Sequence, residues 1–110
     1  MITTHVLDTA VGRPGKSIAI ELERADHGTW HLIGGGVTDD DGRLRTRTPP
    51  GPVQAGTYRI RFQTGAYFAA QGVQGFFPLV EIQFVVADGT QHYHVPLLLS
   101  PYSFSTYRGS

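Results

Sequence analysis

The chain has 110 residues, which is enough for one domain with a buried core. Nine basic and nine acidic residues balance and are interspersed, so the composition argues against a nucleic-acid partner or an anionic membrane surface. Cysteine is absent, which excludes disulfides and thiol chemistry, and no apolar run approaches membrane-spanning length. The first residues carry no basic and apolar leader, so we expect a bacterial cytoplasmic protein without a secretory signal.

Most of the chain alternates apolar and polar side chains with a period of two. This pattern predicts β-strands that turn one face to a core and the other to water. Short segments rich in glycine, proline and aspartate separate the strands and predict turns. In chain order the expected strands are 2–8, 17–23, 57–63, 81–86 and 93–99. The turn signals are Pro14-Gly15, Gly34-Gly35-Gly36, Asp41-Gly42, Pro49-Pro50-Gly51-Pro52 and Asp88-Gly89.

One short helix is expected at residues 66–71, with Thr64 as its N-cap. The chain shows no internal repeat and no linker, so residues 1–110 are predicted to form a single domain. The fold class is therefore all-β: an antiparallel sandwich of about seven or eight strands with one short helix.

Two of the expected strands are not simply amphipathic. In residues 93–99 the apolar side chains occupy both faces, and Pro96 and Leu98 share the face opposite the expected core. In residues 2–8, Leu7 likewise lies on the face opposite Val6. Because an antiparallel sandwich normally shows water one face of each sheet, another subunit is expected to cover this one. The sequence thus predicts an oligomer with histidines at or near its interface.

His92 and His94 lie two residues apart and therefore project from the same face of a strand, where His5 can join them if its strand lies alongside. Such histidines are often no more than half-buried, hydrogen-bonded side chains. Three imidazoles could also bind a tetrahedral zinc ion and leave one position for water. Against zinc, no nearby acidic residue stands out as the outer partner that metal-bound histidines usually keep. Both readings stay open.

Arg43 begins a basic alternation with Arg45 and Arg47 on one face of a short strand. On composition alone, a solvated edge strand explains these charges, because charged side chains discourage edge-to-edge pairing. The preceding residues 39–42 lack the spacing of a calcium loop and are interpreted as a turn.

Several motifs together resemble the transthyretin-related 5-hydroxyisourate hydrolase family. They are Thr3 to Thr9 (TTHVLDT), Asp41-Gly42-Arg43, His92 to Pro101 (HYHVPLLLSP) and the closing Tyr107-Arg108-Gly109-Ser110. The match spans residues 2 to 110. The closing tetrapeptide is its most specific part, because the binding transthyretins that share the fold lack it.

The resemblance implies a prealbumin-like sandwich of two sheets, assembled as a homotetramer with active sites where dimers meet. It implies hydrolysis of 5-hydroxyisourate, a purine-derived small molecule of urate degradation, with no cofactor and no metal. Two other readings remain open: a transthyretin-like carrier of a small ligand, and a histidine-ligated zinc hydrolase. The implied catalytic residues are His5, Arg43 and His94. The implied substrate-binding residues are His5, Arg43, Tyr107, Arg108, Gly109 and Ser110. His92 is implied as a residue that supports them without contacting the substrate itself.

Overall fold

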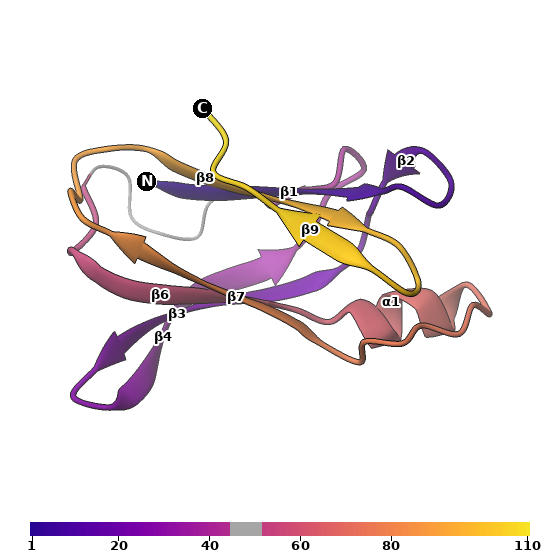
Figure 1. Cartoon of the computed structure of the whole chain (residues 1–110), viewed down its shortest axis with the longest axis horizontal. Coiled ribbons are helices and arrows are strands. Elements are labelled where there is room, and N and C mark those ends of the chain that lie inside the picture. Colours follow the sequence, from indigo (N-terminus) through magenta and orange to yellow (C-terminus); the bar gives the residue numbers. More distant parts are fainter. Residues whose placement is uncertain (45–51) are drawn as a thin grey trace.

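The computed structural model describes residues 1–44 and 52–110. There the chain forms two β-sheets packed face to face, with one short helix at one end (Figure 1). The first sheet contains β1 (Ile2–Asp8), β2 (Arg13–Pro14), β5 (Arg43–Leu44), β8 (Tyr93–Leu99) and β9 (Phe104–Thr106). The second contains β3 (Ala19–Asp26), β4 (Thr29–Val37), β6 (Gly56–Phe62) and β7 (Val80–Val86), and α1 (Thr64–Ala70) joins β6 to β7. The strand orders are β2-β1-β8-β9, with β5 beside β1, and β4-β3-β6-β7.

The predicted all-β sandwich and its core faces are confirmed. Every second side chain of β1, β3, β6 and β8 points between the sheets, as the alternation required. Each large apolar side chain buried there contributes about 1.5–3 kcal/mol relative to leaving it in water. The core residues are Ile2, Val6, Ile18, Ile20, Leu22, Tyr58, Ile60, Phe62, Phe68, Val80, Ile82, Val86, Tyr93, Val95, Leu97 and Leu99.

One strand pair departs from the antiparallel arrangement. β1 and β8 run parallel, with Thr3 opposite His94 and Leu7 opposite Leu98, while the other strand pairs of the described residues are antiparallel. The alternation of side chains does not encode strand direction, so the sequence could not show this. The parallel register brings the beginning of the chain against a strand some 90 residues later.

The predicted helix is present, but its expected cap was wrong. The helix begins at Thr64, and Gln63 precedes it without a side-chain capping hydrogen bond. Thr64 is fully buried, and its hydroxyl donates to the carbonyl oxygen of Phe77 at 3.0 Å. The threonine thus ties the first turn of α1 to the segment that leads into β7.

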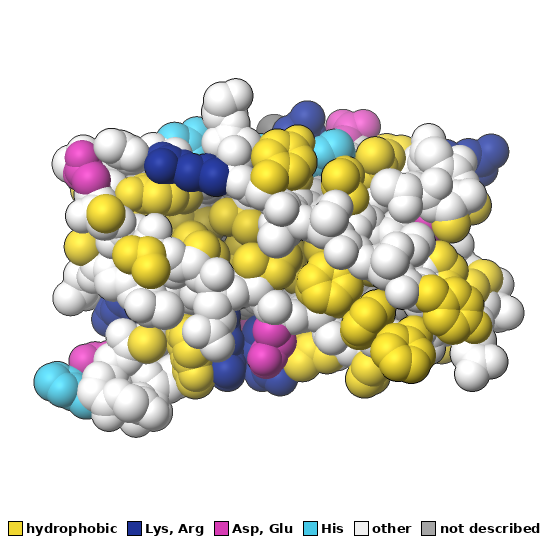
Figure 2. All heavy atoms as spheres, viewed as in Figure 1, with side chains coloured by type: hydrophobic (Ala, Val, Ile, Leu, Met, Phe, Trp, Pro, Cys, Tyr) yellow, Lys and Arg dark blue, Asp and Glu magenta, His cyan; other side chains and the backbone are white. Residues whose placement is uncertain are grey.

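The outer faces of the two sheets differ in chemistry. On the second sheet, Arg59 and Arg61 form ion pairs at 2.8 Å with Glu23 and Glu81, which suits a surface in water. On the first sheet, histidines and apolar side chains of β1 and β8 share the outer face, as predicted. In Figure 2 histidine side chains appear along the upper surface, over the β1–β8 sheet.

Within the described ranges 1–44 and 52–110, no helix has the length and apolar character needed to cross a membrane.

Candidate active site

The predicted histidine pair meets on a threonine of the neighbouring strand. Thr3 on β1 stands opposite His94 on β8. Its Oγ1 lies 2.8 Å from Nδ1 of His94 and 2.7 Å from Nε2 of His92. The ring centroids of the two histidines are 6.4 Å apart. One hydroxyl therefore holds both imidazoles on the outer face of the first sheet.

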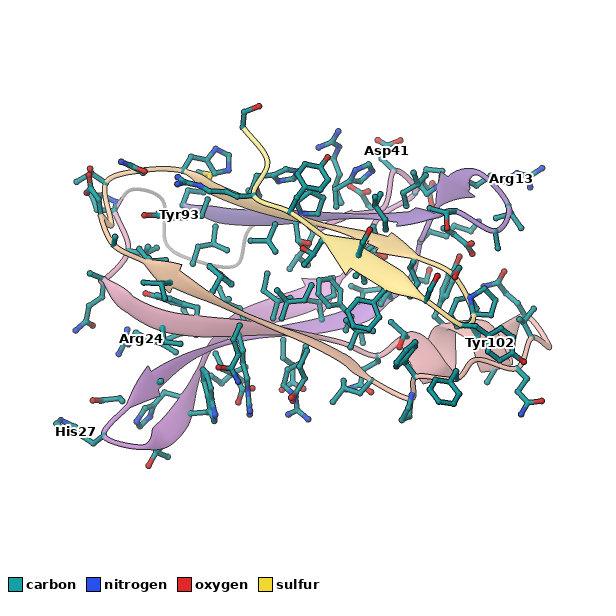
Figure 3. All side chains as sticks on the ribbon, viewed as in Figure 1. Arg13, Arg24, His27, Asp41, Tyr93 and Tyr102 are labelled. Atoms are coloured by element: carbon teal, nitrogen blue, oxygen red, sulfur yellow. The ribbon has the colours of Figure 1, made fainter. Side chains whose placement is uncertain are left out.

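His5 joins the same face from β1, two residues beyond Thr3. Its Nε2 lies 2.8 Å from the carbonyl oxygen of Asp41. Because a carbonyl oxygen can only accept, Nε2 of His5 carries a proton, and Nδ1 is the ring nitrogen that this contact leaves unused. Figure 3 labels Asp41 above β1, on the outer side of the sheet.

Arg43 is placed by the turn predicted at residues 39–42. The Asp39 carboxylate accepts from the backbone N–H groups of Asp41 at 2.9 Å and Arg43 at 3.0 Å. Gly42 adopts a positive φ of 77° and is packed against the backbone of Val6, where a side chain would collide. This turn delivers Arg43 opposite His5 in the β1–β5 pair. Arg45 and Arg47 lie outside the described residues.

The segment after β9 returns to His94. The N–H of Gly109 donates to the carbonyl oxygen of His94 at 2.7 Å, and the two residues form an isolated β-bridge. A Cβ on residue 109 would lie 2.6 Å from Cδ2 of the His94 ring, so glycine is required for this approach. Ser110 reaches the hollow beside the imidazoles. Tyr107 is 59% exposed, and the alternation from Ser105 places it on the outer face.

Arg108 is the one predicted site residue that lies apart from the imidazoles in this protomer. Its guanidinium carbon stands 4.3 Å from the centre of the Tyr93 ring, whose side chain belongs to the core. It also donates to Oε1 of Gln91 at 2.9 Å. Since Tyr107 and Arg108 are neighbours in an extended segment, they point to opposite faces. Figure 3 shows Tyr93 on the inner side of the sheet, away from Asp41.

The surroundings of His94 favour its neutral form. Burial lowers its pKa below the ordinary value of 6.5, and the positive charge of Arg43 and the neighbouring His92 and His5 lower it further. At neutral pH the ring is therefore an unprotonated base. Its Nδ1 is engaged by Thr3, so Nε2 is the nitrogen left for a substrate or water.

An open hollow of about 470 Å³ connects these groups. Its walls come from both ends of the chain and from the middle turn: Met1, Thr3, Thr4, Arg43, Leu44, His92, His94 and Ser110. Among the residues that the structure describes, no three or more histidine or acidic side chains are grouped to hold a metal. The arrangement combines a neutral imidazole, a cation and a polar rim. These groups can assist the addition of water to a carbonyl, because the imidazole can accept a proton from water and the cation can stabilise the negative charge on the carbonyl oxygen.

Thr3 is the residue that the sequence reasoning missed. Threonine is common in strands and gives no chemical signal until the parallel register sets it opposite His94. The two histidines outside the site lie on the surface: His27 is 95% exposed at the β3–β4 hairpin, and His31 is about half exposed beside Asp26. Figure 3 shows His27 at the tip of the β3–β4 hairpin, in the other sheet.

Comparison with known proteins gives the same family as the motifs. The HIUase/Transthyretin family profile matches residues 2–109. A 5-hydroxyisourate hydrolase 2 of Rhizobium meliloti is 48% identical over 114 residues, covering 99% of this chain and 95% of the relative. The solved Klebsiella pneumoniae 5-hydroxyisourate hydrolase superimposes with a TM-score of 0.86 at 36% identity, covering 99% of this chain and 98% of that one.

The same fold also appears in a binding protein. Sea bream transthyretin, solved in complex with thyroxine, superimposes with a TM-score of 0.92 at 34% identity, covering 98% of this chain and 93% of that one. Backbone likeness alone therefore does not separate hydrolase from carrier, and the site chemistry has to do so. From the profile match and the full-length relatives together, the chain belongs to the HIUase/Transthyretin family.

Proposed function

We propose that this protein hydrolyses 5-hydroxyisourate, opening a ring amide to give 2-oxo-4-hydroxy-4-carboxy-5-ureidoimidazoline in urate degradation. The observation that carries the proposal is the convergence of His5, Arg43 and His94 on one face, beside the backbone of Gly109. A carrier has no need of a neutral imidazole beside a guanidinium. Several full-length relatives named as 5-hydroxyisourate hydrolases support the same activity.

In this proposal His94 is the general base. Its lowered pKa keeps Nε2 free at neutral pH, where it takes a proton from the attacking water. Arg43 faces the same hollow and stabilises the negative charge that develops on the carbonyl oxygen. Both groups stabilise the transition state more than the bound substrate, because the charges with which they interact develop only in the transition state.

His5 orients the water. Its Nε2–H donates to the carbonyl of Asp41, so Nδ1 is the ring nitrogen left to contact the water. In this role Nδ1 accepts from the water, and the proton for the departing nitrogen comes from elsewhere. The sequence alone left these two roles exchangeable.

The substrate site is completed by other copies of the chain, in a homotetramer built as a dimer of dimers. Leu7 and Leu98 are only half-buried beside the histidines on the outer face of the first sheet, where a second copy would remove them from water. Ser110 lines the hollow, and Tyr107 is exposed on the same outer face. Arg108 can contact substrate in this scheme only if its side chain leaves Tyr93 or serves a hollow shared with another copy.

The second contact of such a tetramer lies at the sheet edges. β7 and β9 are the last strands of their sheet orders, and Phe77 beside β7 contacts Phe104 of β9 at 5.1 Å between ring centroids. Both edges therefore lie on the same side of the sandwich. Phe76 is 67% exposed and Tyr102 is 66% exposed at this end, where Figure 2 shows apolar side chains gathered near α1. Edge-to-edge pairing would extend both sheets and cover these aromatic side chains.

An ultraviolet assay tests the activity. Freshly generated 5-hydroxyisourate should decay faster with the protein than without it, and an added chelator should not change the rate. His94→Asn should lower kcat by about 100-fold or more. Deletion of residues 107–110 should abolish turnover while circular dichroism still reports a folded sandwich. An unchanged decay rate with the intact protein would remove the proposed activity.

The carrier remains the second candidate, since a thyroxine-bound transthyretin shares this fold. Isothermal titration with thyroxine separates the two. Binding of thyroxine without accelerated decay of 5-hydroxyisourate would identify a carrier. The cytoplasmic location stays a prediction.

A further inference from the structure

The hydroxyl of Thr3 contacts two imidazoles, and it cannot be the hydrogen-bond donor to both of them. It has one proton to donate, so it donates to one ring nitrogen and accepts from the other. Both contacts are short, at 2.7 Å to Nε2 of His92 and 2.8 Å to Nδ1 of His94. The three groups therefore form a directed chain of hydrogen bonds with two possible directions.

The direction of the chain decides what His94 can do. When Thr3 donates to His92, Nδ1 of His94 carries a proton and Nε2 holds the lone pair of a base. When Thr3 donates to His94, Nδ1 accepts and Nε2 carries the proton of an acid. Because the partner of one ring nitrogen fixes the tautomer of the other, reversing the chain turns the base into an acid.

We propose that Thr3 is a positioning residue that relays a proton between His94 and His92, so that His94 serves as base and then as neutral acid within one turnover. The proposal rests on the hydrolysis proposed above. Hydrolysis of a ring amide needs both functions, because water must lose a proton and the departing nitrogen must gain one.

The proposed steps conserve the number of protons. Nε2 of His94 first takes a proton from water as the water oxygen bonds to the ring carbonyl. The Nδ1 proton of His94 then passes to Oγ1 of Thr3 as the Thr3 proton passes to Nε2 of His92. His94 is now neutral with a proton on Nε2, which it donates to the nitrogen as the carbon–nitrogen bond breaks. In the same step His92 returns its extra proton to Oγ1 of Thr3 and Thr3 gives its proton to Nδ1 of His94, so His94 ends neutral with Nε2 free and no imidazolate forms.

The charges around the hollow explain why such a relay is useful. Arg43 and His5 face His94 from β5 and β1, and His92 flanks it on its own segment; all three disfavour a positive ring there. His94 is also half-buried, whereas His92 is exposed to water. Moving the positive charge to His92 places it beyond Thr3, away from Arg43 and in contact with solvent.

Thr3 is held well enough to act in this way. It sits within β1 in the parallel register with β8, and its branched side chain has few rotamers. The β-bridge between Gly109 and His94 fixes the other side of the imidazole. Thr3 and His94 thus stand on neighbouring strands, and His92 immediately precedes β8.

The test compares Thr3→Val, which keeps the shape and removes the hydroxyl, with Thr3→Ser, which keeps the hydroxyl. Thr3→Val should lower kcat by at least about tenfold with KM changed less than about twofold, and Thr3→Ser should stay within about threefold of the unchanged protein. Thr57→Val is the matched control, since Thr57 lies on β6 in the other sheet. Equal kcat values for Thr3→Val and Thr57→Val would overturn the relay.

Two further measurements exclude a merely structural role. In mixtures of light and heavy water, kcat of the unchanged protein should follow a curved dependence on deuterium fraction, and that of Thr3→Val a straight line. His92→Asn removes the other end of the chain, and the double variant Thr3→Val/His92→Asn should be no slower than either single variant. Additive losses, or the same curvature in Thr3→Val, would contradict the relay.

A nuclear magnetic resonance measurement keeps the inference independent of turnover. In protein labelled with ¹⁵N-histidine, the ring-nitrogen shifts of His94 report its tautomer. They should change in Thr3→Val and stay constant in Thr57→Val. Constant shifts in Thr3→Val would defeat the hydrogen-bond chain. Absence of turnover by the unchanged protein would instead defeat the proposed hydrolysis.

Discussion

The ring of His94 sits between a hydroxyl that holds one nitrogen and a cation that disfavours its charged form. Thr3 engages Nδ1, and Arg43 acts on the ring through space. Burial is the largest cause of its lowered pKa. These surroundings keep the ring unprotonated at neutral pH, which is the form that the proposed role of general base requires.

The pH dependence of catalysis follows from that pKa. The folded-state pKa of His94 lies below 6.5, so the base form predominates at pH 7 and is lost as pH falls through the lowered value. Below pH 6.5 the unfolded chain binds the proton more readily, so the free energy of unfolding also decreases there. Arg43→Gln should move the inflection of kcat/KM upward toward 6.5 while it reduces kcat. A profile with its acid limb above 6.5 in the unchanged protein would contradict this reading.

Gly109 is predicted to affect rate more than stability. In Gly109→Ala the new methyl would stand 2.6 Å from Cδ2 of His94 and force the ring to rotate. A displacement of this size should cost about 10- to 100-fold in kcat. Gly72→Ala is the control, because Gly72 has a φ of 69° with open space around it. It should lose about 1 kcal/mol of stability and keep its kcat. The reverse ranking of the two variants would refute the role of Gly109.

The catalytic side chains were identifiable from sequence only through their motifs, because periodicity cannot bring residues 5, 43 and 94 together. Their grouping depends on the β1–β8 register and on the turn that precedes Arg43. The contact of Thr3 with His94 could be recognised only once that register was known. The motifs assigned Tyr107 and Arg108 to substrate binding together, whereas in the structure Arg108 stacks on the core side chain Tyr93.

β1 is also anchored to α1 through a buried carboxylate. Asp8, at the end of β1, is 2% exposed and accepts from the hydroxyl of Tyr67 at 2.8 Å and from the N–H of Ala10 at 3.1 Å. Burial and the hydrogen bond to Asp8 raise the pKa of Tyr67, so its hydroxyl stays a donor at neutral pH. The link fixes the strand that carries Thr3 and His5.

Tyr67→Phe is therefore expected to destabilise the fold. Removing the hydroxyl leaves one oxygen of a buried carboxylate without its donor, which costs about 1–3 kcal/mol in the free energy of unfolding. Tyr102→Phe is the matched control, since Tyr102 is 66% exposed, and it should unfold at the same denaturant concentration as the unchanged protein. Urea titration measures both. Equal stabilities for the two variants would show that Asp8 does not depend on Tyr67.

Strands were the most predictable elements, because their side-chain alternation is dictated by one buried face. The helix was found, but the role of Thr64 was not, since a threonine near a helix start can bond to its own turn or across to another segment. The direction of β1 relative to β8 could not be predicted from the sequence, because side chains alternate in the same way in parallel and antiparallel strand pairs.

The two outer faces of the sandwich predict how the whole molecule assembles. Arg59 and Glu23 belong to a charged outer face, while Leu7 and Leu98 share the other with the histidines. Burying charged pairs is costly, whereas burying apolar side chains is favourable. The first sheet is therefore the face through which dimers should meet.

Leu98→Asp is expected to separate the proposed tetramer into dimers and to lower activity with it. Light scattering should give about 48 kDa for the unchanged protein, four times the 12.0 kDa chain, and about 24 kDa for the variant. Leu32→Asp on β4 is the control, because Leu32 is already 64% exposed, and it should stay tetrameric. Circular dichroism checks that both variants are folded. A fully active 24 kDa species would place the catalytic site within one dimer.

The parallel pairing of β1 with β8 has a consequence for biosynthesis. Thr3 cannot meet His94 until the ribosome has added 91 further residues, and contacts of such long sequence separation form slowly. A nascent chain thus keeps Thr3 and His5 apart from His94 for most of translation. Gain of catalytic competence would then report that the last strands have docked, so turnover itself can time the end of folding.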